Sequence, residues 1–444
     1  CGAKEVPCEC PTMGRTRHAI RGVAGLLFLL HITFHISPSS SPARNLGNPT
    51  KGVITAPAPT SRFRTSAPRR FPGARAQVGF HNGVEGSLAL EAQQVWSPGS
   101  WRGLPASQQP DYADQKALQE ALDNVASLPP LVQHWETKQL KRRLKEVFDG
   151  KRFVLQAGDC AETFGDCTPA SLEARIRVLE QMRLRLESPG SMPGLPVTVI
   201  RRAAGQYGKP RSKPNEIVGG VEMPAFRGEN VNQLPADLNL RQPKPERLVE
   251  GYFRAQCTMN YLRTRLSSPN ALQEYASTAN PSPFATYDTG AREVYTSHEG
   301  LLLGLEQALT RRVGASAADG VLIGGAEETN GWYNAGAHFV WIGTRTKQLH
   351  GAHTEYFRGI DNPIGIKVGS DIDPQTAVSL VRTIDPRNEP GKVVLITRFG
   401  ASNVSTGLPQ LAEAIRAEGL NVVWFVDPMH GNTFKTTLGD KTRR

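Results

Sequence analysis

Acidic residues are absent from one long stretch of this chain, and that absence decides how its positive charge is interpreted. Residues 10–84 contain ten lysines and arginines and no aspartate or glutamate, whereas the 444-residue chain has a formal net charge of +11. Because residues 1–9 carry a net charge of −1, residues 85–444 account for only +2. The basic character therefore belongs to the leader and is poor grounds for nucleic-acid binding by the remainder. We expect no nucleic-acid partner.

Cysteines and long apolar runs are also scarce. The six cysteines show no framework spacing, which excludes a disulfide-stapled small domain and predicts reduced thiols. The apolar run 22–36 is short for a ~20-residue membrane span and contains His31 and His35, so we expect no membrane insertion. Residues 37–75 are rich in Pro, Ser and Arg and lack the apolar material of a packed core.

The sequence therefore predicts a disordered basic leader over residues 1–95. One interpretation is an organellar transit peptide, which would place the protein in a plastid; otherwise we expect a cytoplasmic protein. Translation of non-native sequence is the other interpretation, because the chain starts at Cys1 and not at methionine.

What is present is a series of short apolar runs that each end near a residue able to bind an anion or a metal. The runs are 197–200 before Arg202, 339–342 before Arg345, 364–366 before Lys367, 393–397 before Arg398, and 422–426 before Asp427 and His430. Parallel strands that are buried on both faces have such continuous apolar sequences, and an α/β barrel collects its chemistry where the strands end. Several converging cations predict an anionic, phosphorylated ligand.

Helical patterns alternate with these runs. Two further strands are predicted at 153–157 and 293–296, and the predicted helices are 115–126, 137–148, 169–187, 301–311, 374–384 and 408–418. The segments 267–290 and 313–330 are predicted to be irregular. We thus expect an α/β fold: a TIM-type (β/α)8 barrel over residues 151–444, with a helical extension over 96–150 that packs outside it.

Seven barrel strands can be counted, and we expect the eighth βα unit to be missing from the chain. We therefore expect the first and seventh strands to be unpaired edges, with a core that is open to water.

Three features near the strand ends are candidate ligand sites. The loop after residue 202 combines glycines with Lys209, Arg211 and Ser212, and such a loop can surround a phosphate. Cys160 follows the first strand and His430 follows the seventh, so barrel closure would make this thiol and imidazole neighbours suited to one metal ion. Each residue alone is more often structural, but several cations in register on successive strands favour a site.

His298 and Glu299 follow the predicted third strand, and the sequence leaves their role open. They either form an ordinary helix N-terminus or contribute to the site.

Eight strings in order along the chain carry a family resemblance. They are FVLQAGDCAETF (153–164), GQYGKPRS (205–212), RGENVN (227–232), TSHE (296–299), WIGTRT (341–346), NPIGIKVG (362–369), TRFGA (397–401) and DPMHGNT (427–433). Together they resemble class II 3-deoxy-D-arabino-heptulosonate 7-phosphate (DAHP) synthase, over residues 96–444. The resemblance implies a (β/α)8 barrel that condenses phosphoenolpyruvate with erythrose 4-phosphate, the first step of the shikimate pathway toward chorismate and the aromatic amino acids. It also implies a homo-oligomer and a divalent metal, Mn2+ first and Co2+ second.

The resemblance also implies roles for individual residues. Those for phosphoenolpyruvate are Arg202, Arg345, Lys367 and Arg398; those for the sugar phosphate are Lys209, Arg211 and Ser212; the metal ligands are Cys160 and His430. Thr344, beside Arg345, is a further substrate-binding position. Lys209, Arg345 and Lys367 would be catalytic.

Two departures from the family pattern leave alternatives open. Thr344 stands where the family has an acidic residue, and two further metal ligands of the family, a Glu and an Asp, would lie beyond Arg444. One alternative is therefore an inactive barrel remnant, either a binding or regulatory subunit or a chain with no stable fold. A second is another metal-dependent aldolase that condenses phosphoenolpyruvate.

Overall fold

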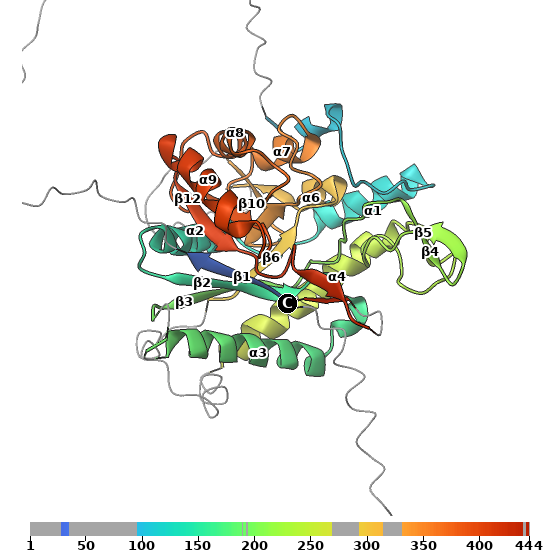
Figure 1. The fold of residues 1–444 in the computed structure, drawn as a ribbon. Helices are drawn as coiled ribbons and strands as arrows, with labels where there is room; N and C mark the ends of the chain where they lie inside the picture. Colours follow the sequence, from blue (N-terminus) through green and yellow to red (C-terminus); the bar gives the residue numbers. More distant parts are fainter. Residues whose placement is uncertain are drawn as a thin grey trace, which may run out of the picture. The chain divides into compact units, whose positions relative to one another are not determined.

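The computed structural model describes residues 28–34, 96–188, 190–191, 194–268, 293–313, 331–437 and 441–443 (Figure 1). Most of the predicted leader, and nearly all of the two segments predicted to be irregular, lie outside the described residues. None of the described helices combines the length and the apolar character that a membrane-spanning segment requires.

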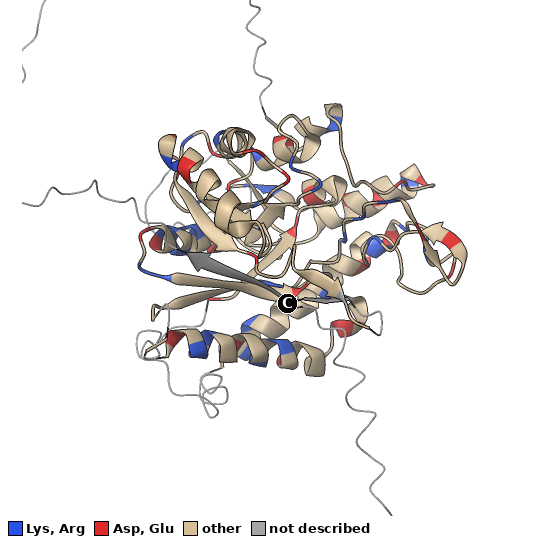
Figure 2. Ribbon diagram, viewed as in Figure 1, with Lys and Arg blue, Asp and Glu red and all other residues tan. Residues whose placement is uncertain are grey.

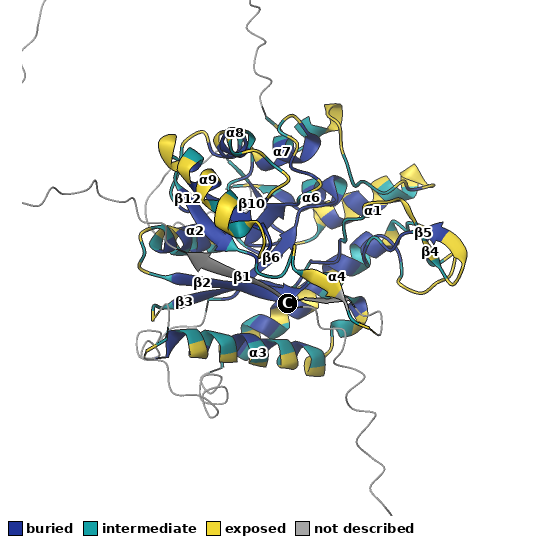
Figure 3. Ribbon diagram, in the orientation of Figure 1, coloured by how far each residue is buried: buried dark blue, intermediate teal, exposed yellow. Residues whose placement is uncertain are grey.

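A curled sheet of seven parallel strands forms the centre of a mixed α/β fold. The strands are β2 (Phe153–Asp159), β3 (Val197–Arg202), β6 (Tyr295–Glu299), β9 (Phe339–Ile342), β10 (Ile364–Val368), β11 (Val393–Thr397) and β12 (Val422–Val426). Each strand pairs in parallel with the next along this series. Nearly all their residues are buried, as the dark strands of Figure 3 show, which explains why the sequences are continuously apolar. The predictions for β9, β11 and β12 are confirmed residue for residue, whereas β6 begins two residues later than predicted.

The two ends of this sheet are joined by a strand from the leader. Strand β1 (Phe28–Phe34) pairs antiparallel with β12 on one side and with β2 on the other, so that the eight strands close into a barrel. The prediction that β2 and β12 are unpaired edges is therefore wrong. Open strand edges carry rows of unpaired N–H and C=O groups, and the backbone of β1 supplies the partners for both rows.

Helices follow most of the strands and cover the sheet. They are α3 (Pro169–Glu187), α4 (Glu246–Leu266), α6 (Leu303–Ala308), α7 (Ala352–Phe357), α8 (Pro374–Ile384) and α9 (Val404–Ala417). α3 and α8 match their predictions, and the side chains of Thr168 and Asp373 cap them. Figure 3 shows α3 divided into a buried face toward the strands and an exposed face. On α3, Figure 2 shows charges of both signs, in keeping with the nearly balanced charge of this part of the chain.

The bounds of α6 and α9 need correction, and two helices, α4 and α7, were not predicted. α6 ends at Ala308, because the chain turns there into the hairpin of β7 (Thr310–Arg312) and β8 (Trp332–Asn334). α9 begins at Val404, four residues before the predicted start at residue 408, and continues through Pro409. α4 was missed, although its buried residues Leu248, Tyr252, Ala255, Met259 and Leu262 recur at helical spacing.

Helix α2 (His134–Phe148) of the N-terminal extension closes the amino-terminal end of the barrel. The extension also contains the short helix η1 (Ser100–Gly103) and α1 (Gln115–Ser127). Leu140 and Leu144 of α2 belong to the same apolar cluster as the inward-facing Val154, Phe339 and Val423. α2 therefore completes the interior of the barrel. The prediction that this helix packs outside the barrel is wrong.

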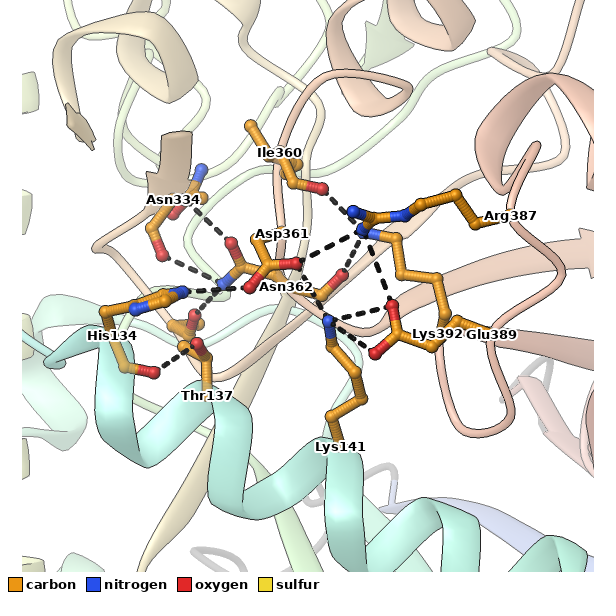
Figure 4. A network of polar contacts seen from close by, with 11 residues as sticks. His134, Thr137, Lys141, Asn334, Ile360, Asp361, Asn362, Arg387, Glu389 and Lys392 are labelled. Atoms are coloured by element: carbon orange, nitrogen blue, oxygen red, sulfur yellow. Dashed lines mark hydrogen bonds and ion pairs between the residues drawn. The ribbon is translucent and has the colours of Figure 1, made fainter. Parts of the chain in front are cut away.

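Polar contacts fasten α2 at this end (Figure 4). The carboxylate of Asp361, which precedes β10, is 2.8 Å from His134 Nε2 and 2.8 Å from Lys141 Nζ, both on α2. Despite burial, these two groups hold the pKa of Asp361 well below its usual range. The nearby Lys392 donates to the carbonyls of Ile360 and Asn362, and burial lowers its pKa to about 7.

Two hairpins complete the described structure. β4 (Asn215–Val218) and β5 (Val221–Pro224) form one, and β13 (Thr433–Lys435) and β14 (Lys441–Arg443) form the other.

Candidate active site

Three inward-facing charged residues meet near the carboxyl ends of the parallel strands. Side chains alternate between the two faces of a strand, so Ile200 and Arg202 face the interior whereas Arg201 faces outward and pairs with Glu180 of α3 at 2.7 Å. The same alternation places Glu299 and Lys367 inward. Arg202, Glu299 and Lys367 are only 2%, 7% and 7% exposed.

The indole of Trp341 supports the two cations of this group. The guanidinium carbon of Arg202 lies 4.4 Å from its ring centroid, and Lys367 Nζ lies 5.3 Å from it. Lys367 Nζ is also 3.6 Å from a carboxylate oxygen of Glu299. Burial lowers the pKa of Lys367, whereas the nearby charge of Glu299 acts to raise it. Burial also lowers the pKa of Arg202. Each of these buried cations would be stabilised by a bound anion.

Several buried N–H donors at this end of the barrel have no acceptor among the described residues. Arg202 donates to the carbonyls of Asp159 and Cys160, at 3.0 and 3.3 Å, but its Nη1 has no partner in that part of the chain. Arg398 Nε and Trp341 Nε1 are also buried and have no acceptor among the described residues. Buried donors in proteins are almost always paired, so this group of donors is suited to the oxygens of a carboxylate or phosphate.

Thr344 and Arg398 contact each other at the edge of this group. The Thr344 hydroxyl accepts a hydrogen bond from Arg398 Nη1. The hydroxyl thus occupies one donor of a cation that was predicted to bind substrate, and it carries no charge to compete with an anion.

The loop after residue 202 is expected to bind the sugar phosphate and is called the sugar-phosphate loop below (residues 203–212). A buried carboxylate holds this loop in place. Glu162 accepts hydrogen bonds from the N–H groups of Ala204, Gly205 and Gln206 at 3.1, 3.0 and 2.8 Å. Ala204 has a left-handed φ of 61°, so these three N–H groups form an anion-binding concavity that the chain fills itself. Burial raises the pKa of Glu162 to about 7. Glu162 was not predicted as a site residue.

The structure brings the sugar-phosphate loop to the loop after β9. Arg345 Nη2 donates to Ser212 Oγ at 2.7 Å, and both residues are exposed at the rim. Arg211 instead pairs with Glu216 of the β4–β5 hairpin. Lys209 Nζ lies 5.7 Å from the ring centroid of Phe226.

Cys160 and His430 both lie in loops at this end of the barrel. Cys160 directly follows β2, and His430 follows β12, with its Nδ1 against the carboxylate of Asp427. Burial lowers the pKa of His430 to about 4, so the ring is neutral near pH 7. Cys160 and Asp427 both contribute to the charge environment of Lys367. Within the described residues, however, no group of three or more His, Cys, Asp and Glu side chains is placed to hold a metal.

The structure separates the roles of His298 and Glu299, which the sequence left open. Glu299 faces inward toward Lys367, whereas His298 Nε2 lies 3.0 Å from Glu306. Burial opposes protonation of His298, but Glu306 raises its pKa. Alternation along the third strand could have distinguished the two, had the start of that strand been known.

The fold and the site together define an α/β protein in which buried cations meet at the carboxyl ends of parallel strands. The family model of the class-II DAHP synthetase family matches residues 96–282 and 275–444. The chain therefore belongs to that family, as the resemblance of its motifs predicted.

Three relatives are similar to this chain over most of its length. A phospho-2-dehydro-3-deoxyheptonate aldolase of Neurospora crassa is 39% identical over 381 residues, covering 79% of this chain and 78% of the relative. One of Streptomyces coelicolor is 37% identical over 387 residues, covering 80% and 82%. Another, of Mycolicibacterium smegmatis, is 37% identical over 367 residues and covers 76% of each chain.

Proposed function

We propose that this protein condenses phosphoenolpyruvate with erythrose 4-phosphate and releases inorganic phosphate, as the first step of the shikimate pathway. The observation that carries the proposal is the group of buried donors around Arg202, Trp341 and Arg398 that lack acceptors in the described part of the chain. Phosphoenolpyruvate carries a carboxylate and a phosphate, and both can accept from guanidinium and ammonium donors.

Each cation has a role in bringing two mutually repelling anions together. Arg202, Lys367 and Arg398, with Arg345 at the rim, bind phosphoenolpyruvate. Lys209, Arg211 and Ser212 bind the phosphate of the sugar. The contact between Arg345 and Ser212 supports a short distance between the two proposed anion sites, because it joins one residue of each set.

The chemistry follows from this placement. The vinyl carbon of phosphoenolpyruvate attacks the aldehyde carbon of the sugar and forms the new C–C bond. This leaves an alkoxide at the former aldehyde oxygen and a cationic carbon at the phosphate-bearing position. Water adds to the cationic carbon, and the proton released from that water neutralises the alkoxide. The resulting hemiketal phosphate loses inorganic phosphate with cleavage of the C–O bond, and the carbon becomes a ketone as its hydroxyl proton passes to the phosphate. Lys367, beside Glu299, offers positive charge close to the carboxylate and phosphate of the reacting molecule.

Cys160 and His430 would hold the divalent metal that the family uses, with Mn2+ as our first choice and Co2+ as the second. The contact with Asp427 leaves Nε2 of a neutral His430 available as a ligand, and a thiolate is a suitable partner. The metal would supply Lewis acidity at the aldehyde oxygen.

We propose further that the closed sheet is a (β/α)8-type barrel in which β1 occupies the position of the eighth strand. Its antiparallel pairing with β2 and β12 supports this assignment. A homo-oligomer also remains our expectation, and Ile217, Leu234 and Leu238, with exposed side chains on and after the β4–β5 hairpin, are suited to an interface between copies.

Phosphate release from phosphoenolpyruvate tests the proposed function. With Mn2+, the full chain should release phosphate in the presence of erythrose 4-phosphate and far more slowly with arabinose 5-phosphate. Preference for arabinose 5-phosphate would instead indicate another condensing aldolase, and no release with either sugar would indicate a binding or regulatory protein. Cys160→Ala should abolish metal-dependent release, whereas Cys257→Ala, at an exposed cysteine, should not.

A further inference from the structure

A segment of the N-terminal extension lies across the loops that carry the site. It comprises residues 105–109, between η1 and α1, and is called the strap below. The carbonyl of Pro105 accepts from the N–H of Ala352 at 3.0 Å, and Ser107 Oγ donates to the carbonyl of Arg345 at 3.0 Å. The strap is thus attached to the segment after β9 that bears Arg345, a proposed substrate ligand.

A second attachment joins the strap to the turn after β6. The side chain of Gln109 donates to the carbonyl of Leu301 at 2.9 Å and accepts from the N–H of Leu303 at 3.0 Å. Because one amide makes both bonds, the position of the strap is fixed relative to β6, whose last residue is Glu299.

Gln108 makes the third attachment, to the sugar-phosphate loop. Its Oε1 accepts a hydrogen bond from the backbone N–H of Arg211 at 2.8 Å. Its carbonyl accepts from Arg227 Nη1 at 3.4 Å. Gln108 has a left-handed φ of 66°, a conformation that costs free energy for any residue with a Cβ. The surrounding bonds therefore hold a strained residue, which is common where a backbone is fixed for binding.

The charges near Gln108 favour an anion. Burial lowers the pKa of Arg227, and the neighbouring Arg211 lowers it further, so the two guanidinium groups are close enough to repel each other. Arg211 is paired with Glu216, whereas Arg227 makes no ion pair within the described residues. A phosphate would relieve this repulsion.

We propose that Gln108 is a positioning residue, which fixes the loop from Lys209 to Ser212 in the conformation that binds the phosphate of the aldose substrate. This inference rests on the proposed function. It assigns the N-terminal extension a part in substrate binding, in addition to its part in closing the barrel. Gln108 itself touches the loop backbone and not the phosphate.

The test uses two variants of the full chain. Gln108→Asn tolerates the left-handed backbone but is too short to reach the N–H of Arg211, and Gln108→Ala removes the amide. The matched control is Gln119→Asn on α1, where an exposed glutamine bonds only Asp123 among the described residues. Loss of one hydrogen bond to the loop should raise KM for erythrose 4-phosphate about five- to ten-fold. The kcat and the KM for phosphoenolpyruvate should stay within about two-fold, a split that a general loss of folding would not produce.

Hydrogen–deuterium exchange of residues 205–212, measured without substrate, tests the positioning separately from catalysis. Exchange there should be faster in both Gln108 variants than in the wild type and the Gln119→Asn control. Unchanged exchange, or an equal rise of KM for both substrates, would overturn the assignment. If the wild-type chain shows no turnover, the proposed function fails, and the exchange comparison still decides whether Gln108 fixes the loop.

Discussion

The contact of α2 with the barrel predicts a specific cost for neutralising Asp361. The Asp361→Asn substitution removes the charge that pairs with His134 and Lys141, whose side chains are both only 9% exposed. Breaking a buried ion pair by removing one partner costs about 3–5 kcal/mol. Lys141 retains Glu389 at 3.3 Å and the amide keeps one acceptor, so we expect a loss of about 2–3 kcal/mol in the free energy of unfolding.

The pH dependence of this loss follows from the low pKa of Asp361 in the folded protein. A carboxyl whose pKa is lowered by folding stabilises the protein fully above its ordinary pKa of about 3.9, and the stabilisation is lost progressively as the pH falls from that value toward the lower pKa of the folded protein. The difference between wild type and Asp361→Asn should therefore be full at pH 7 and smaller by roughly 1 kcal/mol at pH 3.

Urea unfolding followed by circular dichroism measures both effects. Asp123→Asn is the control, because Asp123 is exposed on α1 and accepts from a single glutamine. A change of less than about 0.5 kcal/mol for Asp361→Asn at pH 7, the range of ordinary surface substitutions, would refute the conclusion that this network (Figure 4) fastens α2 to the barrel.

Two further predictions concern the site. Arg202→Lys loses the planar donors that reach the backbone carbonyls of Asp159 and Cys160, so calorimetry should show phosphoenolpyruvate binding about 10- to 100-fold more weakly; unchanged affinity would remove Arg202 from the site. A Cβ at Gly343 would lie 1.9 Å from Glu299 Oε1, so Gly343→Ala should displace Glu299 and lower kcat/KM on the order of ten-fold. Gly103→Ala, which meets nothing within 4 Å, should leave kcat/KM unchanged, and equal kinetics in the two variants would contradict the role of Glu299.

The strands of the parallel sheet could be predicted from the sequence because strands that are buried on both faces have continuously apolar sequences. The bounds of β9, β11 and β12 needed no knowledge of their neighbours. β1 could not be predicted in this way, because its pairing depends on two sheet edges more than a hundred residues away in the chain. The inward packing of α2 was hidden for the same reason, since an apolar stripe on a helix does not say which surface it covers.

The site residues that could be predicted are those at the ends of parallel strands, because these ends meet at the same edge of the sheet. Arg202 and Lys367 were found because each follows a short apolar run, and the structure places both against Trp341. Glu162 and Gln108 were missed because they act on the backbone of a distant loop, and no spacing in the sequence indicates such a bond.

Titration of phosphoenolpyruvate into the full chain, in the presence of Mn2+, tests the central claim most directly. Wild-type protein should bind it, and Lys367→Met should bind it at least about 10-fold more weakly, as expected for the loss of one charged hydrogen bond. Lys151→Met, which removes an exposed lysine at the opposite end of the barrel, should bind like the wild type. Equal affinity in all three proteins, or no binding by the wild type, would contradict the claim that the carboxyl ends of these strands form the substrate site.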